Sequence, residues 1–394
     1  MSLIFERLHP GDASVHNPII WASLSTKPNN PVTYPNYKYV LDVYINSVLV
    51  QRLKAFPQPD TKIGVFDIGP VVRNYVECQL SPGIEFVCQT LVEGQFSLLI
   101  DVEAGEEYNG TVYPNIEAGQ ERYFNTYNEA NFSGLAPIVD YRDKVASTRP
   151  TLSKVRMGET RFFIPFYSES ISALDVTRKL YAKTTRALLN TQTVSTAITN
   201  PHMVIINAAP ESVNNHFATN IDSALHWGYS LQFGNAGAEY FFELTCEKIH
   251  TPYLLHFLNR FGGYETAEFR KRSRINTDIT KKSYGQKNYR VNLRSGDPVI
   301  SYSVNNVLHA PRPTYASTFM DKLKVSSDVL NDDHYVWLRQ LVVSPEVYLD
   351  KGDGLIYPVS IVNTNYEERK YVNDRVTALT IDLEFGNTLN AQYR

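Results

Sequence analysis

The first third of the chain alternates apolar and polar residues with a period of two, the pattern of a strand with one buried face. In the segment 37–45, one side of the expected strand carries Tyr37, Tyr39, Leu41, Val43 and Ile45. A second such side carries Phe96, Leu98, Ile100 and Val102. Asn46-Ser47 and Asn109-Gly110 follow these runs, and such pairs are typical of tight hairpin turns. The pattern therefore predicts antiparallel hairpins.

Short strands separated by turn residues continue through the rest of the chain. The segment 172–189 has apolar residues at both helical and strand spacing, and its β-branched and Thr content favours strands. The segment 227–244 predicts a hairpin with its turn at 234–237. The segment 346–371 predicts three strands joined by tight turns, and 375–387 is the clearest alternating strand.

Two segments predict helices. Residues 66–76 contain Pro70, which suits the first turn of a short helix. Residues 332–343 begin with Asp332 and Asp333, either of which can cap a helix, and Pro345 follows the end.

These elements predict a mainly β protein with two or three antiparallel β-sandwich or barrel-like domains and a few short helices. The expected domains are an N-terminal β-sandwich over 1–145, a middle β-rich domain over 146–250, and a C-terminal β-rich domain over 251–394 that holds the helix near 332–343. A change in composition at 143–151 favours a linker there.

Composition agrees with a folded sheet protein. Of 394 residues, 43% are hydrophobic and only 20% charged, so a substantial core can be buried. The 26 Tyr and 19 Phe suit half-buried sheets and wide protein interfaces. We expect no membrane span, because no stretch approaches ~20 apolar residues. Three cysteines without a CxxC pair, and no apolar run like that of a signal peptide, favour folding in a reducing cytoplasm.

Charge is distributed unevenly. The net charge is -3, yet the segment from Arg260 to Arg294 holds ten Lys or Arg against three acidic residues, which leaves the remainder strongly acidic. Such a basic band suits docking to an acidic surface of a second copy or another protein. The alternative is a strand whose polar face is simply solvated.

No catalytic or ligand-binding signature is present in the sequence. Gly262-Gly263 lacks the Lys and hydroxyl partners of a phosphate-binding loop and favours a turn. Asp350 and Asp353 lack the further oxygen ligands of a calcium loop. Cys246, four residues before His250, is too far along a strand for direct activation. The sequence therefore predicts no enzyme, no cofactor and no metal site.

Nucleic-acid binding is a second interpretation of the basic band. The segment 269–274 mixes cations with nearby aromatic residues, a combination found in single-strand binders. No recognised nucleic-acid-binding module accompanies it, and the acidic remainder weakens non-specific binding. A protein interface is therefore preferred, with contact to packaged DNA as a secondary role.

The segment 251–274 resembles a stretch of tail- and collar-associated virion structural proteins of Bacteroidetes-infecting, crAss-like bacteriophages. The resemblance is carried by an apolar run that ends in Leu258, Asn259, Arg260, Gly262, Gly263 and Tyr264. The segments 337–349, 356–371 and 375–387 are similar to the C-terminal part of the same proteins, and the opening 17–80 to their N-terminal sandwich.

This resemblance implies a virion component near the tail, the collar or the head-to-tail connector, assembled in the host cytoplasm. We expect a homo-oligomeric ring that docks to other virion proteins, with Gly262-Gly263 as a turn and a basic face beyond it. The hypothetical subunit-interface residues are Arg260, Tyr264, Phe269, Arg270, Lys271, Arg272 and Arg274. A receptor- or glycan-binding module of a phage tail is the alternative.

Overall fold

The computed structural model describes most of the chain. The described residues are 3–9, 11–81, 83–128, 135–198, 202–234, 237–245, 252–304, 307–308, 312, 314–330, 332–362, 377–386 and 389–393. Strands make up 54% of the protein and helices 9%, in several antiparallel sheets, which confirms the prediction of a mainly β, sandwich-like fold.

The chain divides into two compact units, each built from more than one segment. Unit 1 comprises Met1–Lys248, Leu255–Ala267 and Asp332–Pro345. Unit 2 comprises Ile249–Leu254, Glu268–Asn331 and Glu346–Arg394. The three consecutive domains expected from the sequence remain a prediction, because these units follow spatial contacts rather than chain order.

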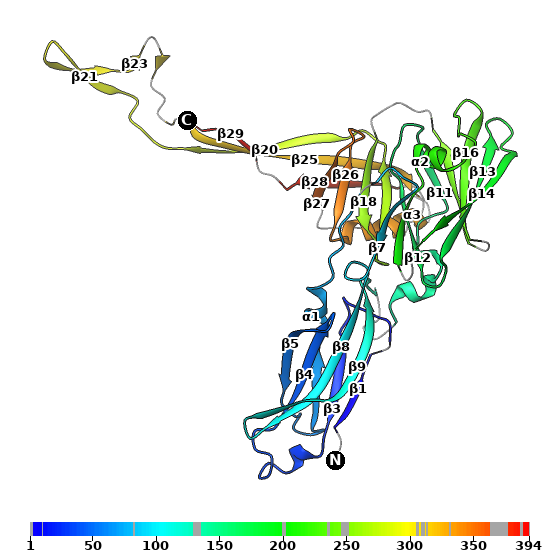
Figure 1. Ribbon diagram of the computed structural model, residues 1–394. Helices are drawn as coiled ribbons and strands as arrows, with labels where there is room; N and C mark the ends of the chain where they lie inside the picture. The colour runs from blue at the N-terminus through cyan, green and yellow to red at the C-terminus, as the bar shows by residue number, and fades with distance from the viewer. Residues whose placement is uncertain are drawn as a thin grey trace. The chain divides into compact units, whose positions relative to one another are not determined.

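The N-terminal part of unit 1 is a sandwich of two sheets (Figure 1, blue to cyan). One sheet has the order β1-β3-β6, with strands Ile4–Arg7, Ile20–Leu24 and Ile63–Asp67. The other has the order β2-β9-β8-β4-β5, with strands Ala13–Ser14, Thr111–Phe124, Ser97–Tyr108, Lys38–Ile45 and Val48–Ala55. Helix α1 (Gly69–Arg73) has Pro70 in its first turn, as predicted.

The alternation seen in the sequence builds the core of this sandwich. The inward side of β4 and the side of β8 from Leu98 to Val102 are buried, and both belong to one apolar cluster with Trp21 of β3. Asn46-Ser47 and Asn109-Gly110 all have positive φ, so both predicted hairpin turns are confirmed. Such turns match the twist of the strands that they connect.

A second sandwich in unit 1 forms the middle of the chain (Figure 1, green). One sheet has the order β10-β12-β15-β7, with strands Lys144–Val145, Phe163–Ser168, His202–Asn207 and Val87–Leu91. The other has the order β11-β17-β16-β13-β14, with strands Leu152–Val155, Glu239–Leu244, His226–Phe233, Ala173–Ala182 and Leu188–Ala197. The strands predicted in 172–189 and the hairpin predicted in 227–244 are therefore confirmed.

The segment 143–151, whose composition favours a linker, is folded into unit 1. Lys144 and Val145 form β10, and Ala146 and Arg149 are buried. The Arg149 side chain donates to Ser153 Oγ at 2.9 Å and lies over the Phe162 ring at 4.6 Å. A polar segment can be buried when the fold supplies partners for its polar groups, and a composition profile does not show those partners.

Strands β18 (Tyr253–Leu258) and β19 (Tyr264–Phe269) flank the predicted turn at Gly262-Gly263. The boundary between the two units falls within each of these strands, so that most of both belongs to unit 1. Helix α3 spans Asp332–Val343, the range in which the sequence predicts a helix. Helix α2 spans Pro210–His216, and short 3-10 turns cover Lys27–Asn29 and Pro137–Tyr141.

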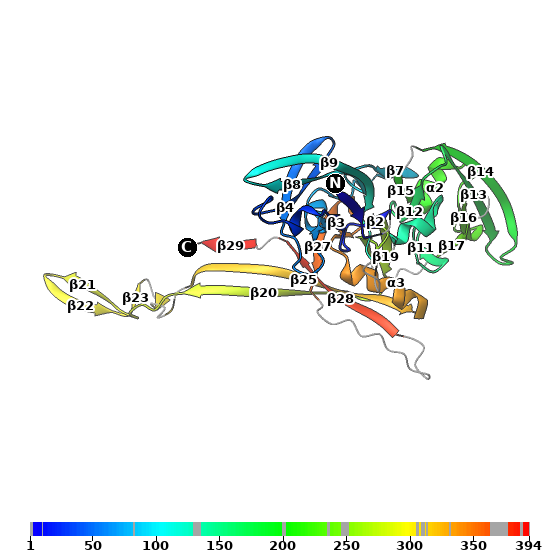
Figure 2. The same cartoon turned by 90° about the horizontal axis from the view of Figure 1, so that it is seen from below.

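An eight-stranded sheet has the strand order β19-β18-β26-β27-β28-β25-β20, and β29 also pairs with β25. All of its strands other than β18 and β19 lie wholly in unit 2. These strands are Val347–Asp350, Ile356–Ile361, Thr377–Phe385, Thr314–Leu330, Arg274–Ser283 and Leu389–Tyr393. Strands β20 and β25 run on from this sheet to two small hairpins, β21-β22 (Arg290–Arg294 and Asp297–Ser301) and β23-β24 (Ser303–Val304 and Val307–Leu308) (Figures 1 and 2, yellow). The alternating strand predicted near the C-terminus is confirmed as β28, with Leu379, Ile381 and Leu383 buried.

Several predicted features lie outside the described residues. They are the centre of the turn at 234–237, the third strand of 346–371, and the pair Cys246 and His250.

Candidate functional site

The sequence motif singled out above forms a buried turn held by Asn259. Its side-chain oxygen accepts hydrogen bonds from the backbone N–H groups of Phe261 at 3.0 Å and Gly263 at 3.1 Å. Its backbone N–H donates to the Gly263 carbonyl at 2.9 Å, and its amide nitrogen donates to the Ala146 carbonyl at 2.8 Å. The predicted turn is therefore confirmed, and its tip is an interior feature of unit 1.

Both glycines of the turn are required by close packing inside unit 1. Gly262 has φ +81 and lies against the Asn125 carbonyl and the Phe96 ring, next to the N-terminal sandwich. A Cβ atom on Gly263 would overlap Pro165 of the middle sandwich. The double glycine thus lets one turn fit between segments that are far apart in the sequence.

A buried polar cluster lies beside this turn. Glu265 is fully buried and accepts hydrogen bonds from Asn259 and, at 2.6 Å, from the Trp337 indole. Arg149 lies over the Trp337 ring at 5.1 Å. Burial raises the pKa of Glu265, against the opposing effects of Arg149 and the hydrogen bonds, and burial lowers the pKa of Arg149. These groups pair with one another, so the cluster has a structural explanation.

The structure separates the seven interface residues predicted from the sequence. Tyr264 and Phe269 are fully buried, so the prediction that they form a subunit surface is wrong for these two rings. Both lie on strands whose side chains turn into the core, which an aromatic residue favours by burial of its area. Arg260 is half-buried, with its guanidinium over the Phe261 ring.

The other four predicted residues lie in unit 2. Arg270 is half-buried and pairs with Glu268, whereas Lys271, Arg272 and Arg274 are exposed. The basic band is therefore divided: Arg260 belongs to unit 1, and the cations from Arg270 onward belong to unit 2.

The cations and many apolar residues gather on an exposed projection of unit 2, which we call the arm and define as residues 274–301. All ten residues of β20 are exposed, including Ile275 at 67% and Ile279 at 60%. Strand β20 is the last strand of its sheet, so its outer edge is unpaired within the described chain. Figures 1 and 2 show β20 and β25 extending to β21, β22 and β23 at the far end.

The hairpin β21-β22, which we call the tip hairpin, has one apolar face. Its register pairs Val291 with Ile300 and Leu293 with Pro298, so these four side chains share a face. Leu293 is 78% exposed, Val291 58% and Ile300 53%. The turn at Ser295-Gly296 has positive φ at both residues, as a tight hairpin requires.

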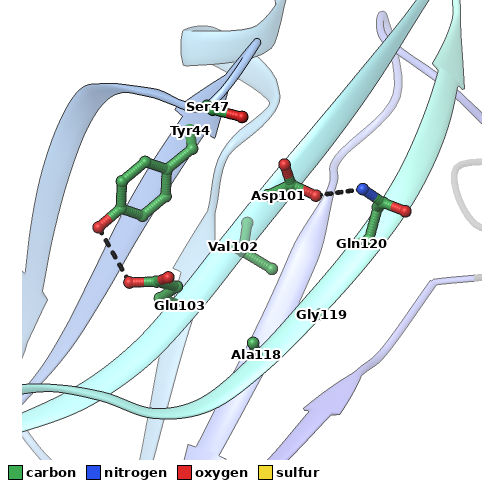
Figure 3. Close-up of a pocket in the computed structure, with 8 residues that line it drawn as sticks. All are labelled: Tyr44, Ser47, Asp101, Val102, Glu103, Ala118, Gly119 and Gln120. Carbon is green, nitrogen blue, oxygen red and sulfur yellow. Dashed lines mark hydrogen bonds between the residues drawn. The ribbon is translucent and has the colours of Figure 1, made fainter.

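A shallow groove of about 460 Å³ lies on the outer face of the sheet β2-β9-β8-β4-β5 in unit 1. Figure 3 shows the residues that line it: Tyr44, Ser47, Asp101, Val102, Glu103, Ala118, Gly119 and Gln120. Tyr44 donates to Glu103 at 2.9 Å, and Gln120 donates to Asp101. The two carboxylates therefore stand beside each other on one strand, held by neutral donors.

The structure also describes the carboxylates that the sequence analysis considered as a calcium site. Asp350 and Asp353 accept backbone hydrogen bonds in the hairpin between β26 and β27, which confirms a tight turn there. Within the described ranges, no three His, Cys, Asp or Glu side chains gather as a metal site would require. Among the helices of the described chain, none is both long and apolar enough to cross a bilayer.

Sequence reasoning missed the tip hairpin and the groove. The tip had a readable signal, because Val291 and Leu293 alternate with polar residues before Ser295-Gly296. The groove had none, because Tyr44, Asp101 and Gln120 come together only through the pairing of β4 with β8 and of β8 with β9.

Comparison with known proteins adds no family assignment. No protein-family model matches the chain, and no curated protein matches it.

Proposed function

We propose that the protein is a structural subunit of a phage virion that assembles with copies of itself into a ring. The ring would belong to the tail, the collar or the head-to-tail connector and would dock to neighbouring virion proteins. The role is one of binding and not of catalysis. The observation that carries this proposal is the arm, which exposes apolar side chains along strand β20 and on one face of the tip hairpin.

Physical chemistry favours an interaction role for such an arm. An isolated two-stranded hairpin is marginally stable in water, and contiguous exposed apolar surface marks binding sites in soluble proteins. The tip hairpin leaves Val291, Leu293 and Ile300 more than half exposed. Covering this face with a second protein would remove it from water and hold the hairpin in one conformation.

The placement in a virion rests on the sequence resemblance of residues 17–80 and 251–394. The structure gives the resembling motif a structural role, since Asn259 and the two glycines hold one turn between the two sandwiches of unit 1. An exposed arm on unit 2 suits a subunit that must join neighbouring copies.

Assembly of the purified chain tests the proposal. Sedimentation velocity over a range of protein concentrations, followed by negative-stain electron microscopy, should show a discrete oligomer with closed rings. Mass spectrometry of purified phage particles should also find the chain in the virion. A chain that stays monomeric at all concentrations and is missing from phage particles would contradict the proposal.

Receptor or glycan binding is the second candidate function, favoured by the groove. Tyr44, Asp101, Glu103 and Gln120 offer an aromatic ring and several hydrogen-bonding groups in one open depression. Glycan-array binding that is lost in Asp101→Asn would support this function. The arm's cations leave contact with packaged DNA as a secondary role.

A further inference from the structure

We infer that the arm of one copy binds the groove on the N-terminal sandwich of the next copy. This inference deepens the proposed function, on which it rests, by naming the two surfaces that join. Each copy would offer its arm to one neighbour and its groove to the other. Contacts between two different surfaces of one chain propagate head to tail and close into rings when the rotation allows.

Several cations of the arm have no acidic partner among the residues that the structure describes. Lys281, Lys282, Lys287, Arg290 and Arg294 are exposed, and none lies within salt-bridge distance of a carboxylate in the described part of the chain. By contrast, Lys322 on the neighbouring β25 is already paired with Asp278 at 2.8 Å. The unpaired cations are therefore available to an acidic surface on another molecule.

The groove carries the complementary charges. Strand β8 has four acidic residues, and Glu106 and Glu107 pair with Lys27 and Lys54. Asp101 and Glu103 are bonded only to the neutral groups of Gln120 and Tyr44 among the residues that the structure describes. These two carboxylates are thus the part of β8 that lacks a counter-charge.

Apolar residues beside the groove can cover the tip hairpin. Leu49 pairs with Tyr44 across β4 and β5 and is 45% exposed, and Ala118 is exposed opposite Glu103. Cross-strand partners share a face of a sheet, so Leu49 and Ala118 border the two carboxylates. The surface therefore offers both charge and apolar contact to a segment with exposed Val291, Leu293 and Ile300.

The length of the arm fits this role. A ten-residue strand such as β20 spans roughly 34 Å, and the tip hairpin adds to it. A stable interface needs about 20–30 residues on each side. The arm supplies that number from one stretch, from Arg274 to Ile300, in which every residue except the half-buried Tyr289 is exposed.

A protein partner fits the arm better than a nucleic acid does. Phosphates would neutralise the cations but would leave the face of Val291, Leu293 and Ile300 in water. Asp297 would also repel a phosphate backbone along the same segment. An acidic surface bordered by apolar residues can pair with the arm's cations and also cover the apolar face of the tip hairpin.

Charge reversal of each surface tests the inference in the full-length chain. The arm variant is Lys281→Glu with Lys287→Glu and Arg290→Glu, and the groove variant is Asp101→Lys with Glu103→Lys. The matched control reverses two exposed lysines of unit 1 that lie outside the groove, Lys144→Glu with Lys183→Glu. Thermal unfolding confirms that each variant is folded, and the neutral Asp101→Asn with Glu103→Gln replaces the groove variant if it is not.

We expect the concentration for half-assembly to rise at least about tenfold for either charge-reversed variant alone and to stay unchanged for the control. An equimolar mixture of the two variants should assemble again, because each arm then meets a groove of opposite charge. Sedimentation velocity measures both results.

The remaining outcomes overturn the inference and identify the alternative. An arm variant that assembles like the wild type shows that the arm is not the interface, although the proposed ring survives. A mixture that fails to assemble shows that the two surfaces do not meet. Wild-type protein that retards DNA through the arm, with assembly unaffected in the variant, assigns the arm to nucleic acid. A wild type that never assembles refutes the proposed function itself.

Discussion

In the buried turn of unit 1, one side chain fixes both the conformation of the turn and its contact with a distant segment. Asn259 satisfies two backbone N–H groups of its own turn and reaches the carbonyl of Ala146, more than a hundred residues earlier. The sequence predicted the turn from its glycines but assigned its neighbours to a surface. Tyr264 and Phe269 are core residues instead, because the strand that carries them is covered.

Replacement of Gly263 tests the packing of this turn. In Gly263→Ala the added Cβ would overlap the rigid ring of Pro165, so we expect the free energy of unfolding to fall by about 1–3 kcal/mol. Urea unfolding measures the change. The matched control is Gly158→Ala, where a Cβ meets nothing within 4 Å, and its effect should stay within about 0.5 kcal/mol. Equal effects at the two positions would contradict the packing argument.

The buried Glu265 predicts a pH dependence. Burial raises the pKa of this carboxyl above its ordinary value of 4.5, so the folded protein holds the proton more tightly than the unfolded chain. The contribution of Glu265 to stability is therefore largest below about pH 4.5 and falls as the pH rises through the folded-state pKa.

Glu265→Gln removes this titration. The free energy of unfolding of the wild type relative to Glu265→Gln should decrease as the pH rises above about 4.5. Urea unfolding of both proteins at a series of pH values gives the difference. A difference that stays constant, or that grows with pH, would mean that Arg149 and the donated hydrogen bonds outweigh burial.

At the scale of elements, alternation and turn residues predicted the strands well. Strands β4, β8 and β28 have their apolar side buried, as the period of two requires. The same reasoning was less successful where burial depended on distant partners. The segment 143–151 looks like a linker in composition, yet Arg149 finds Ser153, Phe162 and Trp337 around it.

The arm is the element whose exposure makes the most direct prediction. Trypsin should cut the monomeric protein first between Lys281 and Arg294, because every Lys and Arg in this stretch is exposed, on the edge strand β20, on the tip hairpin or in the segment that joins them. Mass spectrometry of early fragments identifies the cut sites. Lys183 and Arg186, also exposed but in the turn between β13 and β14, serve as internal reference sites.

Assembly should protect the arm and leave those reference sites open. Cleavage within 281–294 should slow in the oligomer while cleavage at Lys183 and Arg186 continues at the same rate. Early cuts elsewhere in the monomer would show that the arm is more ordered than its exposure indicates.

At the scale of the whole molecule, unpaired cations and unneutralised carboxylates lie in different compact units. Lys281, Lys287 and Arg290 belong to unit 2, whereas Asp101 and Glu103 belong to unit 1. The sequence showed the same uneven distribution of charge, as a basic band and an acidic remainder. It did not show which surfaces carry these charges. Two such surfaces on one chain suit an assembly that uses copies of itself as partners.

The sequence by itself determined the local features: the period of two that buries one side of a strand, the turns at Asn46-Ser47 and Asn109-Gly110, and the helix near 332–343. These depend on backbone sterics and on residues a few positions apart. The tertiary structure alone decided which strands lie side by side. That pairing buried Tyr264, brought Tyr44 beside Glu103 and left the arm uncovered, because contacts between distant segments depend on register that no short pattern encodes.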